Sequence, residues 1–243
     1  MTLVEWPRRV AALAQFRVLD VERPTLTDPD DHHLRRVLRA REGEEVVVTN
    51  GRGSWRLCAV ATTGITPQSD VGEDPAPTDT ALYLSAVKAD RTEWALAKAT
   101  ELGVARVVPL LARRSVTRLG DDARARVLAR WRRVAADAAG QCRRTYDLVV
   151  DPPMSTADVP DEVCVADVGG SPAWSGVRYV AIGPEGGWEP GEWDEGRRRV
   201  SLGPTVLRTE TAAVVAAALI AFDAGDWGFS LPGAAMGKDE ATK

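Results

Sequence analysis

Cysteine and histidine are scarce in this chain of 243 residues, which contains three cysteines and two histidines. Cys58, Cys142 and Cys164 are isolated from one another and form no CxxC pair. An odd number of dispersed thiols argues against a disulfide framework, and the lack of a clustered His/Cys set argues against a zinc site. We therefore expect no metal ion and a reducing, cytoplasmic location.

Long apolar runs are also missing. No segment approaches the ~18 uninterrupted apolar residues that a membrane-spanning helix needs. The first residues, MTLVEWPRRVAALAQF, contain Glu5 and Pro7 and lack the apolar core and cleavage site of a signal peptide. With 44% hydrophobic and 27% charged residues, the sequence predicts a globular protein that has no membrane partner.

The net charge of −4 conceals an uneven distribution along the chain. Residues 101–145 contain 11 Lys and Arg and 4 Asp and Glu, whereas residues 146–243 contain 7 and 16. A concentrated positive segment can bind phosphates even on an acidic protein, but arginines that only solvate a helix face give the same pattern. Charge alone leaves both interpretations open.

Residues 1–72 are expected to form a small β-rich domain. Strands are predicted at 45–49 and 55–60 around an Asn50-Gly51 turn, and a short helix at 32–39 with its N-cap among residues 28–31. The Pro- and Asp-rich stretch 66–79 has no hydrophobic periodicity and indicates a domain boundary.

Strands and helices alternate from residue 80 onward. This order predicts that residues 73–231 form an α/β domain with a parallel sheet covered by helices on both faces, followed by a flexible tail at 232–243. The predicted strands are 81–87, 105–111, 148–150, 163–167, 178–182 and 200–202, and the predicted helices are 90–102, 121–139, 191–199 and 211–224.

Two glycine-containing loops follow consecutive predicted strands in this domain. Both lie at the carboxyl ends of parallel strands, where open α/β sheets bind ligands, and glycine lets a ligand approach the backbone closely. One such loop alone is typical of a plain turn, whereas two in consecutive units indicate a ligand site. They are Ile182-Gly183-Pro184-Glu185-Gly186-Gly187 and Leu202-Gly203-Pro204-Thr205-Val206-Leu207-Arg208-Thr209-Glu210-Thr211.

These loops and several earlier segments resemble the RsmE family of knotted (SPOUT) RNA methyltransferases. GPEGG followed about twenty residues later by LGPTVLRTETA resembles the C-terminal signature of the family. HHLRRVLRAREGEEVVVTNGRG resembles its N-terminal PUA-like domain, KADRTEWALAKATELGV its first knot-domain helix and RWRRVAADAAGQCRR its basic helix. The matches span roughly residues 28–220, which is most of the chain.

The resemblance implies a fold and a cofactor that the periodicity does not show. A PUA-like β-barrel of residues 1–72 would precede a SPOUT domain whose C-terminal segment passes through a loop as a trefoil knot. The last loops would wrap a bent S-adenosyl-L-methionine (SAM), and a valine in place of Gly186 would abolish its binding. The expected SAM contacts are Ala166, Asp167, Ile182, Gly183, Glu185, Gly187, Leu202, Gly203, Val206, Leu207 and Thr211.

The resemblance also implies the reaction, which is methyl transfer from SAM to N3 of a uridine of 16S rRNA in the small ribosomal subunit. The imide proton must leave, and negative charge then spreads onto the flanking carbonyl oxygens. Arg208 is the predicted catalytic residue that stabilises this charge. Glu210, predicted as the second catalytic residue, or Glu185 would accept the proton or orient Arg208. A capping role for Glu210 stays open as well. His32 and His33 are expected to be surface or capping residues.

The expected RNA surface draws on both domains, and the family resemblance implies a homodimer with the active site near its interface. Arginine suits phosphate because its planar guanidinium pairs with two oxygens at once. The residues expected to contact RNA are Arg35, Arg36, Arg39, Arg52, Arg113, Arg114, Gln141, Arg143 and Arg144. Those at the end of the basic helix are the best placed to meet the target strand.

Two alternatives remain within the same fold. One is another SPOUT methyltransferase that acts on a ribose 2′-oxygen or on tRNA, and the other is a non-catalytic RNA-binding module. The small N-terminal domain and the LRTETA stretch favour the base-methylating family, and the intact loop glycines argue against a lapsed cofactor site. One departure concerns residues 145–147, Thr-Tyr-Asp, where the family often has Ile-Pro, so the local path of the chain stays open there.

Overall fold

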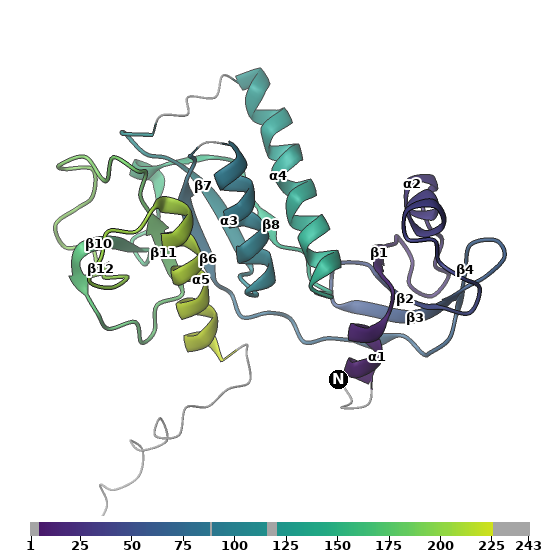
Figure 1. Cartoon of the computed structure of the whole chain (residues 1–243). Coiled ribbons are helices and arrows are strands. Elements are labelled where there is room, and N and C mark those ends of the chain that lie inside the picture. Colours follow the sequence, from purple (N-terminus) through teal and green to yellow (C-terminus); the bar gives the residue numbers. More distant parts are fainter. Residues whose placement is uncertain (1–4, 88, 116–120, 226–243) are drawn as a thin grey trace, which may run out of the picture.

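The computed structural model describes residues 5–87, 89–115 and 121–225, which form two units that lie side by side (Figure 1). The smaller unit contains the N-terminal strands and the larger unit contains the parallel sheet and the three long helices. The C-terminal end of helix α4 (Asp121–Gln141) reaches the smaller unit (Figure 1). The predicted tail at 232–243 lies outside the described residues.

A five-stranded sheet forms the smaller unit. β2 and β3 are antiparallel with Thr49 opposite Trp55, so the predicted turn at Asn50-Gly51 is confirmed. β1 is parallel to β2 on one side, and β4 and β5 pair with β3. Val46 and Val48 are fully buried in its core, while closure into a barrel stays a prediction. The elements are α1 (Glu5–Ala11), β1 (Gln15–Arg17), β2 (Glu45–Thr49), β3 (Ser54–Val60), β4 (Ile65–Pro67) and β5 (Gly72–Glu73).

The helix of the smaller unit begins earlier than expected. It consists of α2 (Asp28–His32) and a π-helical turn, η1 (His33–Val37), so the prediction of a helix at 32–39 was wrong in its start and its type. Thr27 is the N-cap, because its hydroxyl accepts a hydrogen bond from the backbone N–H of Asp30 at 3.3 Å. The aspartates that were expected to cap the helix instead occupy its first turn, where the helix dipole favours negative charge.

The larger unit contains a seven-stranded sheet in which every strand pair is parallel, as predicted. The strand order is β12-β10-β11-β6-β7-β8, and β9 also pairs with β7. The chain runs outward from β6 on one side and returns to its other side with β10–β12, so the loops after β10, β11 and β12 are neighbours. The threading of a knot stays a prediction. The strands are β6 (Ala81–Ser85), β7 (Arg106–Leu111), β8 (Val149–Val150), β9 (Met154–Ser155), β10 (Cys164–Ser171), β11 (Tyr179–Ile182) and β12 (Arg199–Val200).

The three long helices pack as one layer on a single face of this sheet (Figure 1). Leu82 and Leu84 of β6 point into this layer and pack with Trp131 and Ile220, whereas Tyr83 points to the opposite face. Alternate residues of the strand therefore bury both of its faces, as the pleat of a strand requires. The helices are α3 (Ala89–Glu101), α4 and α5 (Thr209–Ala224).

The opposite face is covered by a short 3₁₀ helix, η2 (Thr156–Asp158), and by turns, so the prediction of a helix at 191–199 was wrong. Gly191, where the helix was predicted to begin, has a φ of 72°, which lies outside the right-handed helical region. Trp193, within the predicted range, covers the sheet from these turns and packs edge to face with Trp188, with ring centroids 5.0 Å apart. Within the described residues, no helix is both long and apolar enough to cross a membrane.

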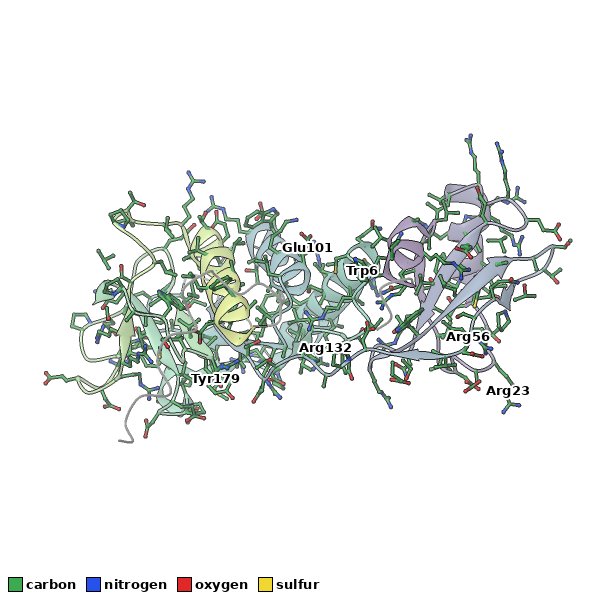
Figure 2. All side chains as sticks on the ribbon, turned by 90° about the horizontal axis from the view of Figure 1, so that it is seen from below. Trp6, Arg23, Arg56, Glu101, Arg132 and Tyr179 are labelled. Atoms are coloured by element: carbon green, nitrogen blue, oxygen red, sulfur yellow. The ribbon has the colours of Figure 1, made fainter. Side chains whose placement is uncertain are left out.

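The two units meet at the turn that follows α4. The backbone N–H of Gly53 donates to the carbonyl of Thr145 at 3.1 Å, and that of Asp147 donates to the carbonyl of Gly51 at 3.0 Å. Trp6 of α1 and Glu101 of α3 lie on either side of this junction (Figure 2) and line a cavity of about 470 Å³ between the units. Residues 145–147 therefore follow a path set by contacts with the β2–β3 turn.

Candidate functional site

The middle of β10 and the carboxyl ends of β11 and β12 surround a cavity of about 170 Å³. Every predicted SAM contact except Thr211 lines it, and both glycine-containing loops contribute. The lining residues are Ala166, Asp167, Val168, Ile182, Gly183, Pro184, Glu185, Gly187, Trp188, Leu202, Gly203, Thr205, Val206, Leu207, Thr209 and Ala212.

Thr211 is exposed and does not line the cavity, so the structure does not bring it to the predicted site. Helix α5 begins at Thr209, which is 3% exposed and faces the cavity. A residue two positions further along a helix is turned by about 200°, which directs Thr211 to the other side. The hydroxyl of Thr209 donates to the carbonyl of Gly183 at 2.9 Å and thereby joins the last helix to the β11 loop.

Two glycines leave open space in the cavity wall. Gly187 and Gly203 have φ values of 67° and 124°, which side-chain-bearing residues rarely adopt, and a Cβ on either would meet no atom within 4 Å. Gly186 differs, because it has no such φ, does not line the cavity and would place a Cβ 3.8 Å from the side chain of Arg114. The expectation that valine at Gly186 blocks the ligand is therefore not supported by its position.

The walls of the cavity are apolar and are held by hydrogen bonds between loops. Ile182 is buried, and Leu202 and Leu207 are partly buried against the core beneath the helices. The indole N–H of Trp188 donates to the carbonyl of Ala166 at 3.0 Å and joins the β11 loop to strand β10. This combination of apolar side chains and accessible backbone suits a flat aromatic base.

Charged groups gather at the mouth of the cavity. Arg91, in the first turn of α3, pairs with Glu185 of the β11 loop, and its Nε lies 3.7 Å from Oε1 of Glu210. Glu210 lies in the first turn of α5, where its charge interacts favourably with the helix dipole. Both carboxylates therefore face Arg91, and neither orients Arg208. Asp167 pairs separately with Arg199.

Arg208 is exposed and is the N-cap residue of α5, but its side chain makes no capping hydrogen bond. Within the described part of the chain it forms no ion pair or side-chain hydrogen bond. Its neighbours Leu207 and Thr209 both line the cavity. The guanidinium is thus available to a ligand at the rim.

The arginines expected to bind RNA divide into exposed and internally bonded residues. Arg35 is internally bonded, because it pairs with Asp31 at 2.9 Å and donates to the carbonyls of Ala61 and Gly64. Arg114 is exposed, and its Nη1 donates to the carbonyl of Gly186 at 3.1 Å, close to the β11 loop. The residues of the predicted surface that are exposed are Arg36, Arg39, Arg52, Arg113, Arg114 and Gln141.

Arg143 and Arg144 are partly buried, line the cavity between the units and donate hydrogen bonds to backbone carbonyls. The guanidinium of Arg143 donates to the carbonyls of Arg9, Ala12 and Gly140 at 3.2, 2.6 and 2.8 Å. Its backbone has a φ of 62°, and burial lowers the pKa of Arg143 from its usual value because the guanidinium is partly desolvated. Arg144 donates to the carbonyl of Thr100 at 3.0 Å. The Arg143 side chain thus joins the two units, whereas the bond donated by Arg144 stays within the larger unit. These internal contacts do not support the prediction that both residues are the best placed to meet RNA.

His32 and His33 are exposed in the smaller unit, far along the chain from the cavity loops. The sequence analysis did not name Arg91 or the lining residues Val168, Trp188 and Ala212, and it quoted Thr209 in the second loop without giving it a role. Thr209 could have been found from the helix start, whereas the pairing of Arg91 depends on contacts between distant segments. In the described ranges, no group of three or more His, Cys, Asp or Glu side chains could hold a metal ion.

Comparisons with known proteins agree with this geometry. A family model described as an RNA methyltransferase domain matches residues 74–221, and one described as an RNA methyltransferase PUA domain matches residues 26–64. A ribosomal RNA small subunit methyltransferase E from Mycobacterium bovis is 32% identical over 226 residues, covering 80% of this chain and 84% of the relative. The protein of the same name from Bacillus subtilis is 26% identical over 234 residues, covering 83% and 91%.

Solved structures show the same fold. The structure of a ribosomal RNA small subunit methyltransferase E from Neisseria gonorrhoeae bound to S-adenosyl methionine has a TM-score of 0.70 and 26% identity, covering 84% of this chain and 95% of that chain. The two units and the cavity thus define an RNA methyltransferase with a PUA domain. The chain belongs to the RsmE family of ribosomal RNA small subunit methyltransferases.

Proposed function

We propose that this protein transfers the methyl group of SAM to N3 of a uridine in 16S rRNA. The observation that carries the proposal is the cavity beside β10 at the carboxyl ends of β11 and β12, which is lined by both loops of the family signature. A cavity at this edge of a parallel sheet is the usual ligand site of open α/β folds.

The residues of this cavity fit SAM. Ile182, Leu202 and Leu207 offer apolar contact for an adenine ring, and the open space beside Gly187 and Gly203 admits ligand atoms close to the backbone. When bound, SAM would supply a methyl group already activated by its sulfonium. The protein then contributes mainly by positioning, which can supply about 7–11 kcal/mol of the barrier.

The groups for proton and charge handling lie at the rim. Arg208 would donate hydrogen bonds to the carbonyl oxygens of uracil as the N3 proton leaves, because it is exposed and unpaired within the described residues. Glu185 lines the cavity and Glu210 does not, so we favour Glu185 as the proton acceptor and a supporting role for Glu210.

The RNA would lie across exposed arginines of both units. Arg36, Arg39 and Arg52 are exposed on the smaller unit, and Arg113 and Arg114 lie near the β11 loop. We further propose a cytoplasmic homodimer whose second copy completes the RNA surface near the cavity.

Incubation of the purified protein with SAM and 16S rRNA, either free or within small subunits, tests this proposal. Digestion to nucleosides and mass spectrometry should detect 3-methyluridine. A 2′-O-methylated nucleoside instead would indicate the ribose-methylating alternative, and SAM binding without any methylated product would indicate a non-catalytic module.

A further inference from the structure

Arg91 connects three segments that are far apart in the sequence. It belongs to the first turn of α3, which follows the central strand β6. Its Nη1 contacts Oε1 of Glu185 in the β11 loop, and its Nε lies 3.7 Å from Oε1 of Glu210 in the first turn of α5. One guanidinium therefore links the β11 loop to the last helix.

The Glu210 half of this link is more shielded from solvent than the Glu185 half. The side chain of Glu210 is only 13% exposed, compared with 31% for Arg91 and 43% for Glu185. A partly buried pair is screened less by solvent and salt than an exposed one. Oε2 of Glu210 is buried and has no hydrogen-bond partner within the described residues, so its charge depends largely on Arg91. Without this cation, two carboxylates would face each other and repel.

Arg91 is placed to affect the cavity only through its partners. It does not line the cavity, whereas Glu185 does. The β11 loop is also held by the hydrogen bond from Thr209 to the carbonyl of Gly183, which starts from the same helix turn as Glu210. The ion pairs and this hydrogen bond thus hold the same two segments together.

We propose that Arg91 is a positioning residue for the SAM site, an inference that rests on the proposed function. It holds Glu185 against the start of α5 and so keeps the two loops of the cavity at a fixed separation. Arg91 acts through the two carboxylates and does not itself contact the ligand.

A double-mutant cycle on SAM affinity tests this inference by calorimetry. Arg91→Met should weaken SAM binding about tenfold, because two unpaired carboxylates would push the loops apart. In a Glu185→Gln/Glu210→Gln background, the same change should weaken binding by less than about threefold, since no like charges remain to be held. If Arg91→Met lowered SAM affinity by the same factor in both backgrounds, the inference would be overturned, and direct contact of Arg91 with SAM would be indicated.

Two further variants serve as controls for this experiment. Arg91→Lys keeps the charge but lacks the fork that reaches both carboxylates, so we expect an affinity between those of the unmodified protein and Arg91→Met. If the methionine variant does not fold, the same cycle is run with Arg91→Lys. An equal loss of SAM affinity in both backgrounds of that cycle would also overturn the inference. Lys98→Met removes the Lys98–Glu101 pair of 2.8 Å on the same helix and should leave SAM affinity unchanged.

The outcomes separate this inference from the proposed function. Failure of the unmodified protein to bind SAM would overturn the proposed function and the role of Arg91 together. Normal SAM binding by the unmodified protein and by Arg91→Met would overturn the positioning role alone.

Discussion

The β11 loop contains two glycines that share a backbone conformation but differ in their position relative to the cavity. Gly187 and Gly191 have φ values of 67° and 72°, and a Cβ on either would meet no atom within 4 Å. Gly187 lines the cavity, whereas Gly191 does not. The pair therefore separates the effect of backbone strain from the effect of filling the ligand space.

Gly187→Ala and Gly191→Ala should lower the free energy of unfolding by similar amounts, about 1–2 kcal/mol, since both place a Cβ in a left-handed conformation. Only Gly187→Ala should also weaken SAM binding, by about tenfold, because the added methyl occupies space open to the ligand. Calorimetric titration with SAM measures the difference. Equal SAM affinities of the two variants would remove this part of the loop from the cofactor site.

Arg208 offers a second test at the scale of one residue. Arg208→Ala should lower the methylation rate by about 10²–10³, the usual scale for the loss of one donor to a developing oxyanion. SAM affinity and melting temperature should change little, because the side chain makes no ion pair or hydrogen bond within the described residues. Arg208→Lys should restore only part of the rate, since an ammonium lacks the planar fork.

Single-turnover rates at saturating SAM and RNA decide the role of Arg208. A rate near that of the unmodified protein would end the catalytic assignment. A loss of SAM affinity and stability along with the rate would instead indicate that Arg208 anchors the loop.

At the scale of whole elements, the hydrophobic pattern predicted most strands and the three long helices, because each buries alternate or periodic residues in one core. β6 and α5 are examples, with Leu82, Leu84 and Ile220 meeting beneath the helix layer. The turns at 191–199 could not be told from a helix, since Trp193 packs on the sheet from an irregular backbone. The loop glycines marked the cavity, whereas the ion pairs of Arg91 depend on three segments that only the fold brings together.

The end of α4 shows a second limit of sequence reasoning. A run of arginines predicts a positive surface, but it does not tell whether a given guanidinium faces solvent or backbone carbonyls. Arg143, in the turn after α4, bonds three carbonyls at the junction of the two units, whereas Arg133 is exposed on α4 itself.

Arg143→Ala should therefore lower the free energy of unfolding by about 2–3 kcal/mol, because three carbonyls lose a charged donor. Arg143→Gly relieves the positive φ of 62° yet should remain destabilising, since it also removes the guanidinium. Arg133→Ala should change stability by less than about 0.5 kcal/mol. Denaturant unfolding compares the three variants, and an unchanged stability of Arg143→Ala would contradict its role at the junction.

At the scale of the whole molecule, the protein has a net negative charge, yet we expect it to bind RNA through local positive surfaces. RNA affinity should fall steeply with salt, because each phosphate contact releases counterions. Combined replacement of Arg36, Arg39 and Arg52 by alanine should reduce the slope of log affinity against log salt by about 1–3. SAM affinity should be unaffected, since these residues belong to the smaller unit. Fluorescence anisotropy at several salt concentrations measures the slope, and an unchanged slope would place the RNA elsewhere.

The two units, the cavity and the exposed arginines together lead to the central claim that a uridine of 16S rRNA is methylated at N3. Mass-spectrometric mapping of 16S rRNA from cells with and without the gene tests it most directly. We expect one 3-methyluridine that disappears without the gene and returns when the gene is restored, but does not return with Arg208→Ala. An identical modification pattern in cells with and without the gene would contradict the claim.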